Sequence, residues 1–167
     1  ALHSPVNVAG GPGAISAGLR ALGVESTLLV FNERPFERGF DVNLELRDTS
    51  RLSSVPFNLP KQLRALRWAL PRFDVFHFHA GLTLAPRRLT LPLLRSRKKG
   101  VVFQSWGSDL RRRRASEVGY LEQADAVIVG SYLTRRLAPR GRWPEYDVVH
   151  PAIVLDDWEP APAEPRD

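Results

Sequence analysis

Residues 100–130 read GVVFQSWGSDLRRRRASEVGYLEQADAVIVG, and this segment determines the class of fold. It opens and closes on short apolar runs, Gly100–Gln104 and Ala124–Gly130, and residues 115–123 between them can form a helix. Short continuous apolar runs are typical of strands that are covered on both faces. Two such strands joined by a helix form a parallel pair. The segment therefore predicts an α/β fold.

The same alternation runs through the rest of the chain. Apolar, β-branched runs predict strands over residues 2–8, 25–31, 42–46, 73–79, 100–104, 124–130 and 146–150. Helices are predicted over residues 14–22, 58–70, 86–96, 115–123 and 131–138. This order predicts a Rossmann-like three-layer α/β/α domain with a mainly parallel sheet over residues 1–150. The Pro-rich end, residues 159–167, is expected to be a linker.

The composition is that of an ordinary globular domain, with 43% hydrophobic and 25% charged residues. No apolar run approaches the roughly 18 residues that a membrane-spanning helix needs, and residues 1–13 lack the pattern of a signal peptide. The absence of cysteine excludes disulfides, thiolate metal sites and cysteine nucleophiles. We therefore expect a cytoplasmic protein. Because methionine is also absent, we expect the chain to be a part of a longer product.

Arginine dominates the basic residues, and the formal net charge is +6. A codon-usage bias would explain this excess without any function. The alternative is a basic surface for an anionic lipid, a phosphorylated substrate or nucleic acid, because the guanidinium group binds phosphate well. The chain has no recognised nucleic-acid-binding motif, so we do not expect nucleic acid as a partner.

Polar residues and glycines gather where the predicted strands end. In an open α/β sheet, ligands bind beyond the carboxyl ends of the strands. We therefore predict a binding site at this edge. The candidates, in chain order, are Asn7, Gly10, Gly11, Gly13, Asn32, Glu33, His77, His79, Gly81, Thr83, Ser105, Trp106, Gly107, Ser108, Asp109, Ser131, Tyr132 and His150.

The first candidates form a glycine loop, residues 10–13, in front of a predicted helix. Backbone N–H groups at a helix N-terminus suit a phosphate group. The loop lacks the third glycine of the dinucleotide-binding fingerprint, and Pro12 removes one donor, although Glu33 lies about 20 residues on, where a ribose-binding acid is expected. The alternative is a turn that needs glycine only for its backbone conformation.

Two histidines share one predicted strand. We expect His77 and His79 to face opposite sides of the sheet, with His77 in the core and His79 lining a cleft near the end of the strand. Two histidines with no acidic or cysteine partner nearby make a poor metal site, so no metal is expected. Asp109 is a candidate ligand or, equally, a turn residue. The run Arg111–Arg114 is either a solvated charged surface or an anion-binding patch.

Five segments carry a family resemblance. They are NVAGGPGAISAGLRALGVES (7–26), FDVFHFHAGLTL (73–84), VVFQSWGSDLRRRR (101–114), ADAVIVGSYLTRRL (124–137) and VVHPAIVLDDWEP (148–160). In this order they resemble the N-terminal half of GT-B glycosyltransferases of the GT4 type.

The resemblance implies one half of a retaining glycosyltransferase, which transfers a sugar from a nucleotide-sugar donor. This half would bind the acceptor, a small molecule, glycan or lipid-linked molecule, and the other half would bind the nucleotide sugar. Residues 151–167 would be the interdomain hinge and tail, and the C-terminal nucleotide-sugar domain is absent from this sequence. Alone, this half would be inactive. No cofactor and no metal are expected, and association with the inner face of the membrane stays open.

The resemblance also implies site residues. Trp106 stands where many family members have a histidine, and an indole can neither shuttle a proton nor accept a hydrogen bond. The catalytic candidates are His79 and Asp109. The glycines placed near the donor diphosphate are Gly10, Gly11 and Gly13, and the acceptor-binding candidates are Asn7, Trp106, Ser108 and Arg111. The alternative function is a stand-alone α/β module that binds an anionic ligand or a partner without catalysis.

Overall fold

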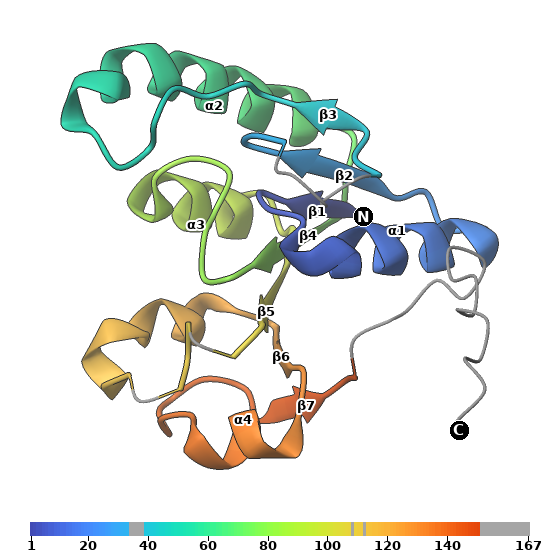
Figure 1. Cartoon of the computed structure of the whole chain (residues 1–167), viewed down its shortest axis with the longest axis vertical. Coiled ribbons are helices and arrows are strands. Elements are labelled where there is room, and N and C mark those ends of the chain that lie inside the picture. The colour runs from blue at the N-terminus through green and yellow to red at the C-terminus, as the bar shows by residue number, and fades with distance from the viewer. Residues whose placement is uncertain (34–38, 108, 112, 151–167) are drawn as a thin grey trace, which may run out of the picture.

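The chain forms one seven-stranded sheet in which every pair of neighbouring strands is parallel. A computed structural model describes residues 1–33, 39–107, 109–111 and 113–150. The strand order is β3-β2-β1-β4-β5-β6-β7 (Figure 1). The strands are β1 (Leu2–Ser4), β2 (Thr27–Val30), β3 (Val42–Asn43), β4 (Val75–His79), β5 (Gly100–Ser105), β6 (Ala126–Val129) and β7 (Tyr146–Val148). The predicted Rossmann-like α/β fold is confirmed.

Helices lie on both sides of this sheet. The α-helices are α1 (Gly11–Ala21), α2 (Val55–Ala69), α3 (Arg87–Ser96) and α4 (Tyr132–Leu137). The short 3₁₀ helices are η1 (Val8–Gly10), η2 (Leu52–Ser54), η3 (Ala115–Glu117) and η4 (Gly119–Gln123). Helix α1 packs beside β1 and β2 on the side of the sheet opposite to α2 and α3 (Figure 1). In place of the helix predicted over residues 115–123, the chain forms the two short 3₁₀ helices η3 and η4.

The hydrophobic core fills the side of the sheet that faces α2 and α3. Alternate residues of the central strands, among them Phe76, Phe78 and Phe103, are at most 2% exposed and pack with the apolar faces of these helices. On the other side of the sheet, the alternate residues of β5, β6 and β7 are less covered. Val102 and Ile128 are half-buried, and Asp147 is exposed. Helix α1 therefore shields only part of its face.

Two helices begin earlier than predicted. Helix α1 begins at Gly11 because Gly10 takes a left-handed conformation, with φ of 73°, and Pro12 fits the first turn. The predicted helix start at residue 14 is therefore three residues late, while the positive φ of Gly10 fits the alternative of a turn that needs glycine for its backbone conformation. Helix α2 begins at Val55, so Pro60 lies inside it. The buried side chain of Asn58, also inside α2, accepts from the Arg47 N–H at 2.8 Å and donates to the Arg47 carbonyl at 3.0 Å.

No helix in the described ranges combines the length and apolar character that crossing a bilayer requires. The predicted linker, residues 151–167, lies outside the described part of the chain.

Candidate functional site

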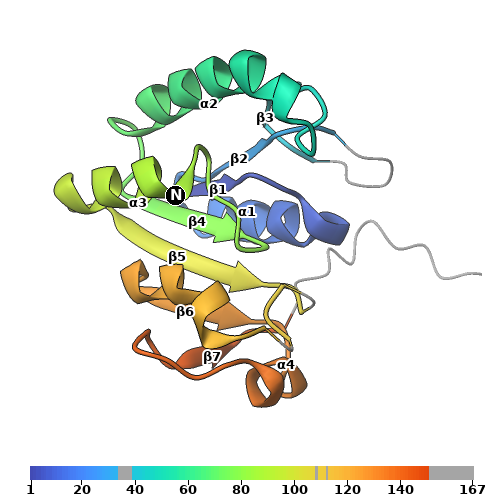
Figure 2. The same cartoon turned by 90° about the vertical axis from the view of Figure 1, so that its left-hand side faces the viewer.

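The candidate site lies where the chain reverses its direction across the sheet. From β1 the chain moves through α1 to β2 and β3, and α2 then carries it back across to β4, on the other side of β1. Figure 2 shows the strands pointing the same way, so that their carboxyl ends share one edge. In open α/β sheets the crevice between the two strands at such a reversal is the usual ligand site. Here those strands are β1 and β4.

The glycine loop follows β1 at this edge, and its backbone donors already have partners. The N–H of Gly13 donates to Oδ1 of the buried Asn7 at 2.9 Å. The N–H of Gly10 donates to the Asn7 carbonyl at 3.3 Å, that of Gly11 donates to the Val8 carbonyl, and Pro12 has none. The diphosphate role of these glycines stays a prediction. A diphosphate could accept a hydrogen bond from the Gly13 N–H only if the Asn7 side chain released that group.

Trp106 closes the loop from the β5 side. A Cβ added at Gly11 would lie 2.7 Å from Cζ3 of Trp106, so the ring lies directly against this glycine. The same ring lies 6.0 Å from the ring of His79 between centroids. Its Nε1–H is buried and has no hydrogen-bond partner among the described residues. Trp106 therefore links the glycine loop to the end of β4 and holds an unused donor.

We expect Gly11→Ala to destabilise the domain by about 1–3 kcal/mol, because the new methyl group must displace the Trp106 ring. Gly18→Ala is the matched control in the same helix: a Cβ there meets nothing within 4 Å. This control should stabilise the domain by about 0.4–1 kcal/mol through the loss of glycine flexibility. Urea denaturation of both variants measures the difference. Equal effects would show that Trp106 does not pack on Gly11.

Asp109 organises the turn after β5. Its Oδ1 accepts hydrogen bonds from Ser105 Oγ at 2.8 Å, from the Trp106 N–H at 3.1 Å and from the Gly107 N–H at 3.0 Å. Gly107 has φ of 126°, which favours glycine. Of the two interpretations of Asp109, the structure bears out the turn residue. A ligand-binding role for the same carboxylate stays a prediction.

A pocket of about 300 Å³ opens beside this turn. Its lining includes Gly81, Arg87, Asp109, Arg113 and Tyr120. The Arg87 guanidinium lies over the Tyr120 ring, 4.2 Å from its centroid, and Arg113 pairs with Glu117 at 3.5 Å. Glu117 also lines this pocket, so two arginines face two carboxylates there. A second pocket of about 370 Å³ lies at the amino end of β7 and is lined by Arg135, Arg140, Gly141 and residues 143–146. It lies away from the edge where the strands end.

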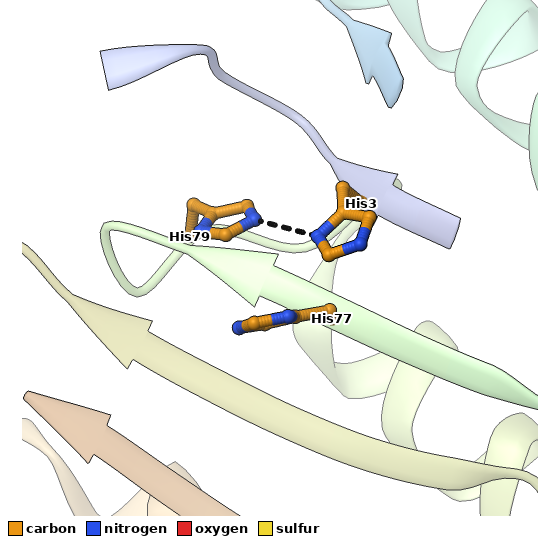
Figure 3. A group of neighbouring side chains, drawn as sticks. All are labelled: His3, His77 and His79. Carbon is orange, nitrogen blue, oxygen red and sulfur yellow. Dashed lines mark hydrogen bonds between the residues drawn. The ribbon is translucent and has the colours of Figure 1, made fainter. Parts of the chain in front are cut away.

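Three histidines from β1 and β4 meet beneath the crevice (Figure 3). His3 of β1 and His79 of β4 are fully buried, and His77 of β4 is 7% exposed. His3 Nδ1 lies 3.3 Å from His79 Nε2. The ring of His77 lies 4.8 Å from that of His3 and 4.5 Å from that of His79 between centroids. We call these three residues the histidine cluster.

The histidine cluster corrects two predictions. His77 and His79 do not face opposite sides: residues two apart on a strand share a face, because the side-chain period of a strand is two. His79 does not line an open cleft either, since its side chain is fully buried. The expectation that His77 is buried is confirmed. A catalytic role for His79 stays a prediction.

His3 was missed by sequence reasoning. The signal for it is the pairing of β1 with β4, which sets His3 directly beside His77 in register. That pairing joins residues more than 70 positions apart, so no local pattern contains it.

Burial makes the histidine cluster hard to protonate. It lowers the pKa of His3 to about 3, and His77 and Arg20 act in the same direction. Burial also lowers the pKa of His77 to about 4, while the Gln104 side chain, whose carbonyl can accept from the protonated ring, acts to raise it. The pKa of His79 lies well below its ordinary 6.5, from burial and then from the two neighbouring histidines. At neutral pH all three imidazoles are therefore neutral.

The remaining candidates do not join this site. Glu33 is exposed, and Arg111 is exposed with its guanidinium close to Gly107. Ser131 caps α4 by accepting from the Thr134 N–H at 3.1 Å. His150 is exposed and its ring packs edge-on against Tyr132. Ser108 lies outside the described residues.

The chain matches no protein-family model, and no curated protein matches it. The geometry of the strand-end site is therefore the basis for the proposals that follow.

Proposed function

We propose that the chain is the N-terminal, acceptor-binding part of a retaining glycosyltransferase that uses a nucleotide-sugar donor. The observation that supports this proposal is the meeting of three sequence segments at one edge of a parallel sheet. The glycine loop follows β1, residues 80–81 follow β4, and the Trp106–Asp109 turn follows β5. They belong to three of the five segments that carry the resemblance to GT4-type enzymes.

In this proposal the pocket beside Asp109 receives the acceptor. Arg87 and Arg113 suit an acceptor that carries phosphate or carboxylate, because guanidinium groups form forked hydrogen bonds with both. Trp106 contributes its unused N–H once a small movement opens it to the crevice. His79 lies beneath Trp106 and contacts the acceptor only after the same movement. The donor diphosphate approaches the glycine loop, where it competes with the Asn7 side chain for the N–H of Gly13.

The test is an assay of the complete gene product with a panel of nucleotide sugars. We expect slow donor hydrolysis without an acceptor, and transfer with retained anomeric configuration when an anionic acceptor is added. The 167-residue chain alone is expected to show neither. A complete product that neither binds nor hydrolyses any nucleotide sugar would overturn the proposal.

Arg87→Gln is expected to raise the KM for the acceptor at least about tenfold, the loss of one charge-assisted hydrogen bond. The KM for the donor should not change, because Arg87 lines the acceptor pocket and not the glycine loop. Arg142→Gln is the matched control, since Arg142 is exposed in the loop before β7. Steady-state kinetics with each substrate varied in turn measures both constants. An unchanged acceptor KM would remove this pocket from the proposal.

The second candidate function is a stand-alone module that binds an anionic ligand without catalysis. The two arginines that line the same pocket and the net charge of +6 favour it. Calorimetry of the 167-residue chain with phosphorylated sugars separates the two. Tight binding by this chain, with no turnover by the complete product, supports the module.

A peripheral location at the cytoplasmic face of a membrane belongs to the same set of proposals. Basic residues near positions 87–88 and 111–114 would contact anionic lipid there. Co-sedimentation with anionic vesicles, which salt should abolish, is the corresponding measurement.

A further inference from the structure

We propose that His3, His77 and His79 form a binding site for a divalent transition metal ion of the zinc type. The inference does not depend on the proposed glycosyltransferase activity. It departs from the expectation of no metal, which considered only His77 and His79. The third histidine reaches them from β1, and one ring nitrogen from each residue lies within 4.8 Å of the others.

The distance between two of these nitrogens already fits a shared ion. Zinc binds imidazole nitrogen at about 2.0–2.1 Å in tetrahedral geometry, which puts two ligand nitrogens of one ion about 3.3–3.4 Å apart. His3 Nδ1 and His79 Nε2 are 3.3 Å apart. Only His77, the one cluster residue with any exposure, has to turn its ring for its nitrogen to complete the set.

The hydrogen bonding of the cluster is incomplete. His3 Nε2, His77 Nε2 and His79 Nδ1 are buried and have no partner among the described residues. Burying unpaired polar atoms is unfavourable. His3 Nδ1 and His79 Nε2 share one hydrogen bond, so one of these two nitrogens carries the proton. A metal ion would replace this hydrogen bond with two metal–nitrogen bonds, and the protonated ring would take the tautomer whose proton lies on its other nitrogen. His77 offers one ring nitrogen as the third ligand.

The chemistry of the ligand set selects the metal. Neutral imidazole suits Zn²⁺, Co²⁺, Ni²⁺ and Cu²⁺, whereas Mg²⁺ and Ca²⁺ require oxygen ligands. Metal binding requires unprotonated ligands, and burial holds all three histidines in that form at neutral pH. The arrangement of three side chains on two adjacent strands is seen in Figure 3.

The number of protein ligands indicates what the ion could do. Structural zinc sites have four protein ligands, whereas sites with three keep one position for water or a substrate atom. The cluster has three, and it lies at the β1/β4 crevice, below Trp106. A metal ion here would present its fourth position beneath the candidate ligand site.

The experiment titrates Zn²⁺ into the ¹⁵N-labelled 167-residue chain at pH 7.5 and follows the imidazole nitrogens by NMR. The chain has four histidines, so His150 is an internal control in the same sample. We expect the resonances of His3, His77 and His79 to shift together and to saturate at one ion per chain, while His150 does not move. No shift, or a shift of His150 alone, would overturn the proposal.

Variants provide the second test. His77→Gln should weaken Zn²⁺ binding by more than about 100-fold, more than the loss of a residue that only supports a ligand. His150→Gln should leave the affinity unchanged. Binding is measured by competition with a chromophoric chelator, and circular dichroism checks that each variant is folded. If His77→Gln does not fold, the NMR titration of the unmodified chain decides alone. A folded His77→Gln variant with undiminished affinity contradicts the proposal.

Discussion

Lowering the pH from 7 to about 4.5 is expected to remove several kcal/mol from the free energy of unfolding, mainly through the histidine cluster. In the unfolded chain each histidine titrates near its ordinary pKa of about 6.5. In the folded chain the pKa is lowered, to about 3 for His3 and about 4 for His77. The unfolded state therefore binds more protons between these values.

The sign of the effect follows from this difference. The contribution of each histidine to the free energy of unfolding is fully present above about pH 6.5. It declines by about 1.4 kcal/mol per pH unit as the pH falls toward the pKa of that histidine in the folded state. The carboxylates with lowered pKa, Asp48, Asp74 and Glu117, titrate below this window. The groups that modulate the cluster are Arg20, which further disfavours its protonation, and Gln104, which favours it.

Urea denaturation at pH 7, 6 and 5, without added metal, measures the dependence. His77→Gln should lower the slope by about one third, because one of three linked protons is removed. His150→Gln should leave it unchanged, since this side chain is exposed. A slope that is the same in the unmodified chain and in His77→Gln would show that the cluster does not control acid stability.

The second large effect is expected at Asp109. Asp109→Ala should destabilise the domain by about 3 kcal/mol, because the Trp106 and Gly107 N–H groups and the Ser105 hydroxyl lose their shared acceptor. Asp109→Asn keeps an acceptor oxygen and should cost about 1 kcal/mol. Chemical denaturation compares the two.

Activity separates the two roles that are assigned to Asp109. In the complete gene product, Asp109→Asn keeps the turn but removes the charge. A large loss of kcat in this variant, with little loss of stability, would assign a catalytic role to the carboxylate. A variant that is stable and fully active would confine Asp109 to the turn. Equal destabilisation by Ala and Asn would contradict the hydrogen-bond account.

The fold could be predicted because its determinants are local. Each buried strand is a short apolar run, and most crossovers carry a helical pattern, so the alternation alone indicates a parallel sheet. The predicted start of α1 is three residues too late, because glycine and proline are also signals of a turn. The same two residue types, which break a helix in its middle, are common at its first turn. Residues 115–123 were predicted as one helix but form the two 3₁₀ helices η3 and η4, which no periodic pattern in this segment indicated.

The candidate site could be predicted only in part. That ligands bind at the strand ends follows from the fold class, and the Asp109 turn lies there. The histidine cluster could not be found in the same way, because it depends on the register of two strands that are distant in the chain. The opposite-face assignment of His77 and His79 was an error in applying the strand period, which by itself places both rings together.

The central position of β1 has a consequence for the order of folding. β1 is the first strand in the chain, yet it is held between β2 and β4. Its contacts with β4 close a loop of more than 70 residues, and such long closures form slowly. Strands β1 to β3 pair with sequence neighbours, and so do strands β4 to β7. His3 meets His77 and His79 only when β1 pairs with β4, so the cluster reports that the two halves of the sheet have joined.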